Sequence, residues 1–258
     1  MDIKLNLVAF QTIANKEIKR ILRIWSQTLL PPVITQSLYF IIFGGFVGSR
    51  ISGYNNAGGY MGFLVPGIVM MAVITNSYTN VVSSFFGAKF QRNYEELLVS
   101  PTSPSTILLG YCFGGCFRGL LIGFLVLLIS IFFVPLSIVN PFIILLYAAL
   151  TSSAFSLLGF FNSLFAKSFD DVNIIPTFVL TPLTYLGGVF YSIKSLPEFW
   201  QNISKFNPII YMIDGFRFGF SGQSEINIFL SLSVLIALNS IMIGINLYLI
   251  NKGYGLKN

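Results

Sequence analysis

The sequence predicts an all-α membrane protein that crosses the bilayer several times. Of its 258 residues, 55% are hydrophobic and only 9% are charged, whereas about a quarter of the residues in a soluble domain are charged. Two stretches without any charge, 119–166 and 226–251, exceed the roughly 20 residues that a helix needs to span a bilayer. A β-barrel is disfavoured, because its strands alternate in polarity over segments of about ten residues.

Turn-forming residues divide the apolar runs into six predicted spans. The stretch 53–59, GYNNAGG, is a polar hinge, and Asn140 followed by Pro141 breaks another run. The predicted spans are 29–48, 61–83, 113–134, 142–165, 172–193 and 227–250. We expect them to form a single transmembrane domain over residues 1–258.

The basic residues predict how these spans are oriented. If the N-terminus is cytoplasmic, most of the 15 basic residues lie on inner segments, as the positive-inside rule requires. These inner residues are Lys4, Lys16, Lys19, Arg20, Arg23, Lys89, Arg92, Lys167, Lys252 and Lys257. The outer segments hold Arg50, Lys194, Lys205 and Arg217. We therefore expect both termini in the cytoplasm, and no nucleic-acid partner, because the charge is not gathered into one patch.

Residues 3–25 predict an amphipathic helix that precedes the first span. Its apolar residues recur at spacings of three and four, and its basic residues share the other face. This pattern is typical of a helix that lies in the membrane interface, with basic groups toward lipid headgroups and an aromatic anchor at its end. The residues expected to contact membrane lipid are Lys16, Lys19, Arg20, Arg23 and Trp25.

The segment 88–101 is a charged patch between the second and third spans. Its charged residues recur at helical spacing and its apolar residues lie opposite them, which predicts an amphipathic helix. A helix this short needs the membrane surface or a groove on a partner to cover its apolar face, and we favour a partner that delivers force. The expected contact residues are Phe90, Gln91, Arg92, Tyr94, Glu95 and Glu96.

Arg118 is an anomaly inside the predicted third span, where an arginine costs about 2.5 to 3.5 kcal/mol on insertion scales. If that span begins near 113, the side chain lies close enough to the cytoplasmic edge to reach outward as an anchor. The alternative is that Arg118 pairs with Glu95 or Glu96 and fixes the amphipathic helix to the bundle. We favour the anchor.

The fifth span and the segment after it are irregular. Pro176 and Pro182 predict a kinked helix within 172–193. The outer segment 194–225 is too polar to span a membrane, and it predicts two short helices in a re-entrant hairpin, with Asp214 and Arg217 paired at a spacing of three. An amphipathic lid with a surface ion pair and a substrate contact both remain open.

Several residue types that chemistry would require are missing from the sequence. There is no histidine, and Cys112 and Cys116 are best read as apolar filler, so we expect no metal site. A phosphate-binding loop and a catalytic cluster are also missing, so we expect no catalytic residue and no cofactor in this chain. The acidic residues lie in loops or at helix ends, which disfavours ion coupling. The energy source is then another protein.

Particular segments carry a family resemblance. FQRNYEELLVSPTS and NPIIYMIDGFRFGFSG resemble two signature regions of the type-2 exporter class of ATP-binding-cassette (ABC) permeases. SQTLLPPVITQSLYFIIFG, SSFFGAKFQRN and PTFVLTPLTYLGGVFYS resemble, in the same order, an inner-membrane permease type of enteric bacteria. The stretches NNAGG and LLGYCFGG depart from that pattern, which leaves the substrate open.

The resemblance implies how the chain works. It implies a homodimer of six-span subunits in the bacterial inner membrane, with two copies of a separate ATPase subunit that bind ATP and Mg. Residues 88–101 would be the coupling helix, which enters a groove on the ATPase. The exported substrate would be amphipathic, lipid-linked or drug-like, with unknown binding residues. The alternatives are an ion-coupled carrier or a channel without an ATPase, and a membrane scaffold.

Overall fold

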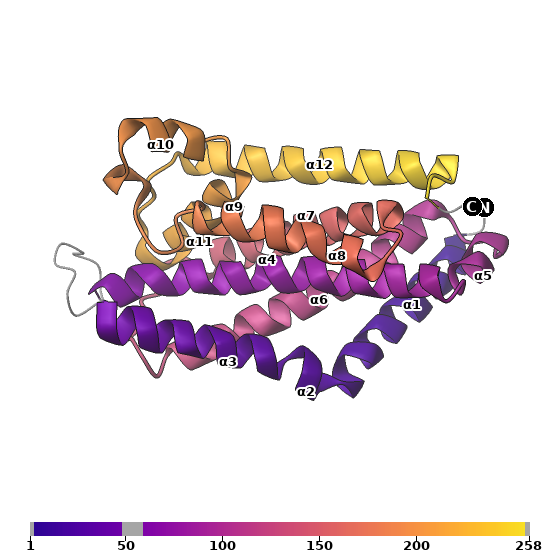
Figure 1. Ribbon diagram of the computed structural model, residues 1–258, viewed down its shortest axis with the longest axis horizontal. Helices are drawn as coiled ribbons and strands as arrows, with labels where there is room; N and C mark the ends of the chain where they lie inside the picture. The colour runs from indigo at the N-terminus through magenta and orange to yellow at the C-terminus, as the bar shows by residue number, and fades with distance from the viewer. Residues whose placement is uncertain (1–2, 48–58, 256–258) are drawn as a thin grey trace.

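The computed structural model describes residues 3–47 and 59–255, and every regular element within these ranges is a helix (Figure 1). The all-α class is therefore confirmed. The elements are α1 (Ile3–Arg23), α2 (Trp25–Thr28), α3 (Leu30–Tyr39), η1 (Phe40–Val47), α4 (Gly59–Phe90), α5 (Tyr94–Val99), α6 (Pro104–Ser130), α7 (Pro141–Phe165), α8 (Phe169–Ile175), η3 (Pro176–Leu180), α9 (Thr181–Tyr185), η4 (Ile193–Ser195), α10 (Glu198–Ser204), α11 (Pro208–Ser221) and α12 (Ile228–Lys252). The hinge expected at 53–59 lies almost entirely outside the described residues.

Four of these helices are long and apolar enough to cross a membrane: α4, α6, α7 and α12. They match four of the predicted spans. The other two predictions, 29–48 and 172–193, fall on interrupted helices, α3 with η1 and α8 with η3 and α9. Each of these segments changes helical geometry partway along, so neither is a single continuous α-helix.

The interruption in the second of these segments follows from its prolines. Proline has no N–H to donate, so carbonyl groups one turn earlier lose their backbone partner. The chain widens into a π-type turn over η3, where the Thr181 hydroxyl donates to the Pro176 carbonyl at 2.9 Å. One turn further on, the Thr184 hydroxyl donates to the Leu180 carbonyl at 2.6 Å. The helix is interrupted where the prolines predict, and the two threonine hydroxyls add hydrogen bonds to carbonyls at the break, where the Pro176 carbonyl also accepts the Thr181 N–H.

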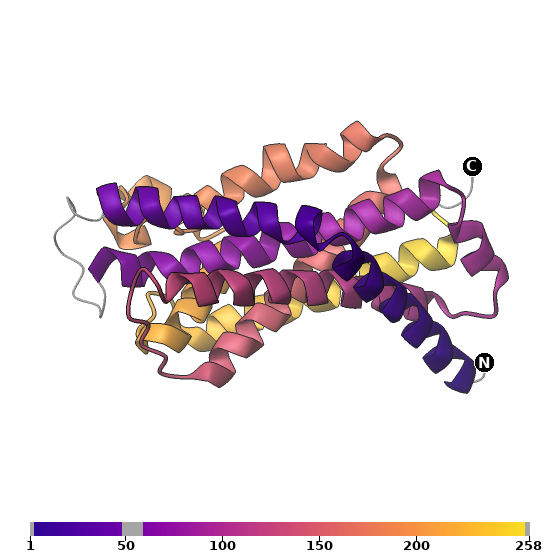
Figure 2. The same cartoon turned by 90° about the horizontal axis from the view of Figure 1, so that it is seen from below.

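The centre of the bundle is α4, which packs along both α6 and α7 (Figures 1 and 2). Glycines on α6 allow this close approach. A Cβ added at Gly119 would lie 3.1 Å from the Val73 carbonyl oxygen on α4, and one at Gly114 would lie 2.6 Å from Glu17 Cβ on α1. Small residues let the backbones of membrane helices pack directly against each other, so α6 holds α1 on one face and α4 on another.

The bundle has two different ends. The start of α1, the end of α12 and all of α5 lie at one end, and α10 lies at the other (Figures 1 and 2). The expected outer hairpin does form two short helices. Asn207 caps α11 by accepting from the Ile209 N–H at 3.0 Å, and Gly222 ends it with a φ of 68°.

Candidate functional sites

The charged segment after α4 lies at the end of the bundle where the described chain starts and ends. The prediction of one continuous helix over 88–101 is wrong. Helix α4 continues to Phe90, a turn follows, and α5 begins at Tyr94. The break occurs because Arg92 has a φ of 59°, a left-handed conformation that an α-helix does not contain.

The expected contact residues divide into an exposed set and one buried residue. Phe90 is 66% exposed, and Glu95 and Glu96 stand exposed on the first turn of α5. Tyr94 is only 7% exposed, because it packs into an apolar cluster beside Tyr111. Tyr94 therefore fastens α5 to the bundle and is not available to a partner, whereas Phe90, Gln91, Arg92, Glu95 and Glu96 are.

Beside this segment lies a hollow of about 720 Å³ between the end of α4, the end of α7 and the C-terminal turn. Lys89 lines it and donates to the Leu164 carbonyl at 2.8 Å and the Ala166 carbonyl at 3.1 Å. Lysine near a helix C-terminus satisfies carbonyls that have no helical partner. Lys89 thus ties the last turn of α4 to the end of α7.

The start of α8 stands at the same end and is closed by a capping box. The Asp171 carboxylate accepts the N–H groups of Lys167 at 2.8 Å and Ser168 at 3.0 Å, and the Ser168 hydroxyl accepts the Asp171 N–H. These two backbone donors lower the pKa of Asp171. Asp171 is therefore a helix cap, as its position before the fifth predicted span indicates.

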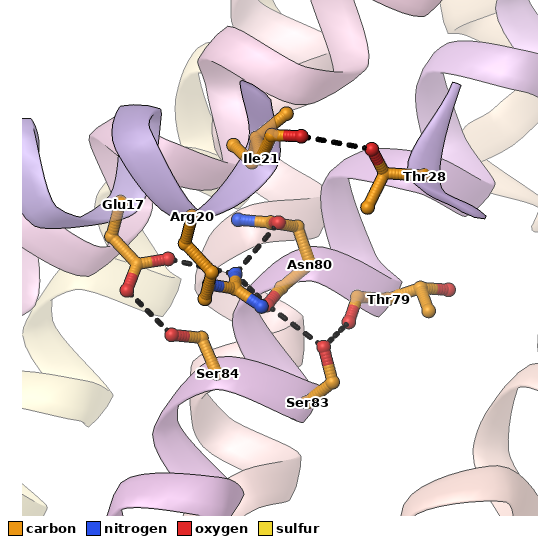
Figure 3. Close-up of polar contacts among 8 residues, drawn as sticks. All are labelled: Glu17, Arg20, Ile21, Thr28, Thr79, Asn80, Ser83 and Ser84. Atoms are coloured by element: carbon orange, nitrogen blue, oxygen red, sulfur yellow. Dashed lines mark hydrogen bonds and ion pairs between the residues drawn. The ribbon is translucent and has the colours of Figure 1, made fainter. Parts of the chain in front are cut away.

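Helix α1 is amphipathic, but one of its predicted lipid contacts is wrong. Lys16, Lys19, Arg23 and Trp25 are exposed. Arg20 instead turns inward, where its Nη2 donates to Glu17 Oε2 and to Asn80 Oδ1, both at 2.8 Å (Figure 3). The half-buried Arg20 side chain is held by an opposite charge and a side-chain carbonyl, in place of the headgroup contact that we expected.

Glu17 completes this polar cluster and was missed from the sequence. It is fully buried, and its Oε1 accepts the Ser84 hydroxyl at 2.6 Å (Figure 3). Two elements far apart in sequence, α1 and α4, are therefore joined by a carboxylate, a guanidinium, an amide and a hydroxyl. The available signal was a lone acid three residues before Arg20, on the same helical face as Ala14 and Ile21.

Arg118 is neither an outward-reaching anchor nor a partner of Glu95 or Glu96. Helix α6 begins at Pro104, well before the predicted 113, so Arg118 lies in the middle of the helix. Its Nη2 donates to the Thr28 carbonyl at 3.2 Å and to Asn76 Oδ1 at 3.4 Å. The Thr28 carbonyl at the end of α2 is free to accept because the residues three and four positions later, Pro31 and Pro32, have no N–H.

Arg118 lines an open-sided cavity of about 470 Å³ bounded by α2, α3, α4, α6, η3 and α9. Several of its wall residues, such as Thr35, Thr75 and Thr177, are exposed. The polar wall comprises Gln27, Thr35, Gln36, Thr75, Asn76, Thr177, Thr181 and Thr184. A second part of the wall contains Tyr39 and Tyr185, whose hydroxyls lie 3.1 Å apart. Thr75 and Asn76, neutral hydrogen-bonding residues of α4, face this space together with Arg118.

The segment 194–225, which we predicted as an outer hairpin, is held by two buried charged residues. The Asp214 carboxylate accepts the N–H groups of Glu225 and Ile226, each at 3.0 Å. Arg217 donates to the Gly188 carbonyl at 2.8 Å and lies 3.7 Å above the Phe63 ring. The surface ion pair that we predicted is wrong in its setting, because Asp214 is 2% and Arg217 7% exposed. Both residues fasten the hairpin to the bundle.

These features define a multi-helix membrane protein with an exposed charged segment at one end and a polar cavity within it. The chain belongs to the ABC-2 type transporter family, which it matches over residues 8–221. It is 54% identical over 251 residues to the inner membrane transport permease YadH of Escherichia coli K12, covering 97% of this chain and 98% of that protein. YadH of Shigella flexneri matches equally well.

A more distant relative is nodulation protein J of Rhizobium leguminosarum bv. viciae, which is 26% identical over 196 residues, 74% of this chain and 73% of that protein. The family resemblance carried by the coupling and hairpin segments is confirmed, as is the similarity to the enteric permease. The chain is a membrane permease subunit of an ABC transporter.

Proposed function

We propose that this permease exports an amphipathic, lipid-linked or drug-like substrate, and that a separate ATPase subunit, which binds ATP and Mg, drives it. The observation that carries this proposal is the pair of roles within the segment 88–101. Tyr94 is buried and fixes α5 to the bundle, while Arg92, Glu95 and Glu96 remain exposed on the same short segment. A partner that moves these exposed groups would move the end of α4 with them.

We propose six spans with both termini in the cytoplasm. Four continuous helices and two interrupted ones, α3 with η1 and α8 with α9, would supply the spans. The start of α1, the end of α12 and α5 share one end of the bundle (Figure 1), and most basic residues lie on the segments at that end. We infer that this end meets the ATPase at the inner face of the bacterial inner membrane.

We also propose a homodimer with two ATPase copies, because ABC-2 membership implies a paired arrangement in which substrate crosses between two permeases. In this arrangement ATP binding would favour one of two conformations of the bundle, by an amount limited to its differential affinity for them. The exposed face of α1 would lie against membrane lipid.

The test is the triple variant Arg92→Ala, Glu95→Ala, Glu96→Ala, purified with the ATPase subunit and reconstituted in vesicles. We expect ATP-driven transport to fall at least about tenfold, the scale of losing contacts at the centre of an interface. The bundle should remain folded, because all three side chains are exposed. Co-purification, ATP hydrolysis and transport are measured together.

The matched control is Lys194→Ala, Glu198→Ala, Lys205→Ala, three exposed charges near the opposite end. This variant should couple as the wild type does. Unchanged coupling in the first variant contradicts the assignment of the coupling segment. Transport by the permease alone, without any ATPase, would instead support the carrier or channel alternative.

A further inference from the structure

We infer that the cavity around Arg118 binds the anionic group of an amphiphile, and that this group selects the transported substrate. The selection of a transported substrate rests on the proposed function, whereas the binding site itself does not require transport. Its starting point is the charge of the cavity wall. Among the described residues that line the cavity, Arg118 is the one with a formal charge.

The positive charge of Arg118 is not neutralised within the described part of the chain. No carboxylate of residues 3–47 or 59–255 lies within ion-pair distance of it, whereas Arg20 contacts Glu17 at 2.8 Å. A cation held at depth in a membrane protein without an opposite charge is unfavourable. Binding an anion in the cavity would supply the missing charge.

The guanidinium also has donors to spare. Arginine carries five N–H donors, and both hydrogen bonds of Arg118 leave from Nη2, at 3.2 and 3.4 Å. Its Nε also has no partner among the described residues but is closed to solvent, so a ligand in the cavity would contact the terminal Nη groups. A planar fork with free donors is suited to the oxygens of a phosphate or carboxylate, which it can contact in a bidentate manner.

A second polar group in the same cavity lacks a partner. Gln36 is 7% exposed and lines the cavity, and its Oε1 has no hydrogen bond within the described residues. A buried carbonyl oxygen without a donor costs free energy. Because this oxygen is closed to solvent, a hydroxyl or amide on the ligand would satisfy it once the Gln36 side chain turns toward the cavity.

The rest of the wall suits the apolar part of such a ligand. Met71, Leu180, Pro31 and the rings of Tyr39 and Tyr185 line the same space. A cavity of about 470 Å³ lies within the range of small-molecule sites, roughly 300 to 1,000 Å³, which combine an apolar lining with a few polar groups. The site therefore fits an anionic amphiphile, either a bilayer lipid or a soluble molecule.

The arginine is held in place by its neighbours. The Asn76 side chain donates its Nδ2 to the Ala72 carbonyl at 2.9 Å, which leaves Oδ1 directed at Arg118. The Thr28 carbonyl fixes the guanidinium from the other side. These two acceptors orient Arg118 without neutralising it, as a binding group requires.

The test measures binding of dodecyl phosphate to the full-length permease in nanodiscs of zwitterionic lipid, without the ATPase. We expect saturable binding, while dodecyl maltoside and dodecyltrimethylammonium bind weakly. Arg118→Gln should weaken binding of dodecyl phosphate at least about tenfold, the scale of a charge-assisted hydrogen bond. The matched control Lys194→Gln removes an exposed basic residue that does not line the cavity and should bind as the wild type does.

A second variant guards against misfolding of the first. Asn76→Asp is nearly isosteric and places a carboxylate where Oδ1 now lies 3.4 Å from Arg118. It should fold and should still lose binding of dodecyl phosphate, because the internal pair occupies the guanidinium. If both variants bind dodecyl phosphate as tightly as the wild type, or if dodecyl maltoside binds the wild type equally well, the inference is overturned.

Two further measurements distinguish a bilayer lipid from a soluble ligand, and the binding site from the proposed export. Anionic phospholipid added to the nanodisc competes with dodecyl phosphate if a bilayer lipid is the ligand, and leaves its binding unchanged if a soluble amphiphile is; both outcomes support an anion site. In the complex with the ATPase, binding of dodecyl phosphate without ATP-driven transport would contradict the proposed export but not the site. ATP-driven transport by the wild-type complex, with no loss of dodecyl phosphate binding in Arg118→Gln, would contradict the site but not the proposed export.

Discussion

Two arginines contact α4 one helical turn apart, and they differ in whether a carboxylate lies beside them. Arg20 donates to Asn80 Oδ1 and Arg118 donates to Asn76 Oδ1. Arg20 also has a buried carboxylate, Glu17, at 2.8 Å, whereas Arg118 has none within the described residues. Both arginines therefore join helices, but of the two it is Arg20 whose charge is neutralised within the described residues.

The largest expected effect on stability comes from breaking the ion pair between Glu17 and Arg20. Glu17→Ala leaves the Arg20 guanidinium without its carboxylate and empties a fully buried position. Removing one partner of a buried ion pair costs about 3 to 5 kcal/mol; we expect about 2 to 4 kcal/mol, because the Arg20 side chain is 32% exposed and water screens it. Thermal unfolding in detergent measures the loss.

The control for this variant is Glu96→Ala, which removes an exposed acid and should change stability by less than about 0.5 kcal/mol. The double variant Glu17→Leu, Arg20→Met should recover most of the lost stability, because it removes both charges together. Equal destabilisation by the single and double variants would mean that the lost packing, and not the stranded charge, is responsible.

A smaller effect is expected from the hydroxyl that supports the same carboxylate. Ser84→Ala removes the hydrogen bond to Glu17 Oε1, 2.6 Å long, and leaves the ion pair in place. Hydrogen bonds to charged groups contribute about 1.5 to 3 kcal/mol, so we expect a loss of about 1 to 2 kcal/mol in the same unfolding assay. Ser84→Thr keeps the hydroxyl and should lose less.

The smallest effect on stability is expected at Arg118, which has no carboxylate beside it within the described residues. Arg118→Gln removes a charge that no described carboxylate neutralises, and this gain offsets the lost hydrogen bond to the Thr28 carbonyl. We expect the free energy of unfolding to change by less than about 1 kcal/mol in either direction. A loss as large as that of Glu17→Ala would erase the contrast between the two arginines.

The sequence predicts those parts of the fold that depend on local pattern. Uncharged runs locate α4, α6, α7 and α12, and prolines locate the interruption between α8 and α9. The N-cap Asn207 and the glycine at 222 bound α11. In each case the signal lies within a few residues of the element that it defines.

The parts that could not be predicted depend on contacts between distant segments. Arg118 meets the Thr28 carbonyl across 90 positions of sequence, and no periodicity encodes that pairing. Arg20 shares a helical face with other basic residues, so its pattern indicates lipid headgroups until Asn80 is known to lie beside it. The turn at Arg92 contains neither glycine nor proline, which would have marked it.

The charged pair on α1 constrains how the protein is made. Glu17 and Arg20 leave the ribosome first, but Asn80 follows Arg20 by 60 residues, and the glycines of α6 that receive α1, Gly110 and Gly114, come later still. Until then neither charge has its final neighbours, and moving either charged side chain into the hydrocarbon core of the bilayer costs free energy. In a nascent chain truncated before α6, we therefore expect α1 to remain in the hydrated headgroup region. We expect α1 to dock on the bundle when α6 has been synthesised.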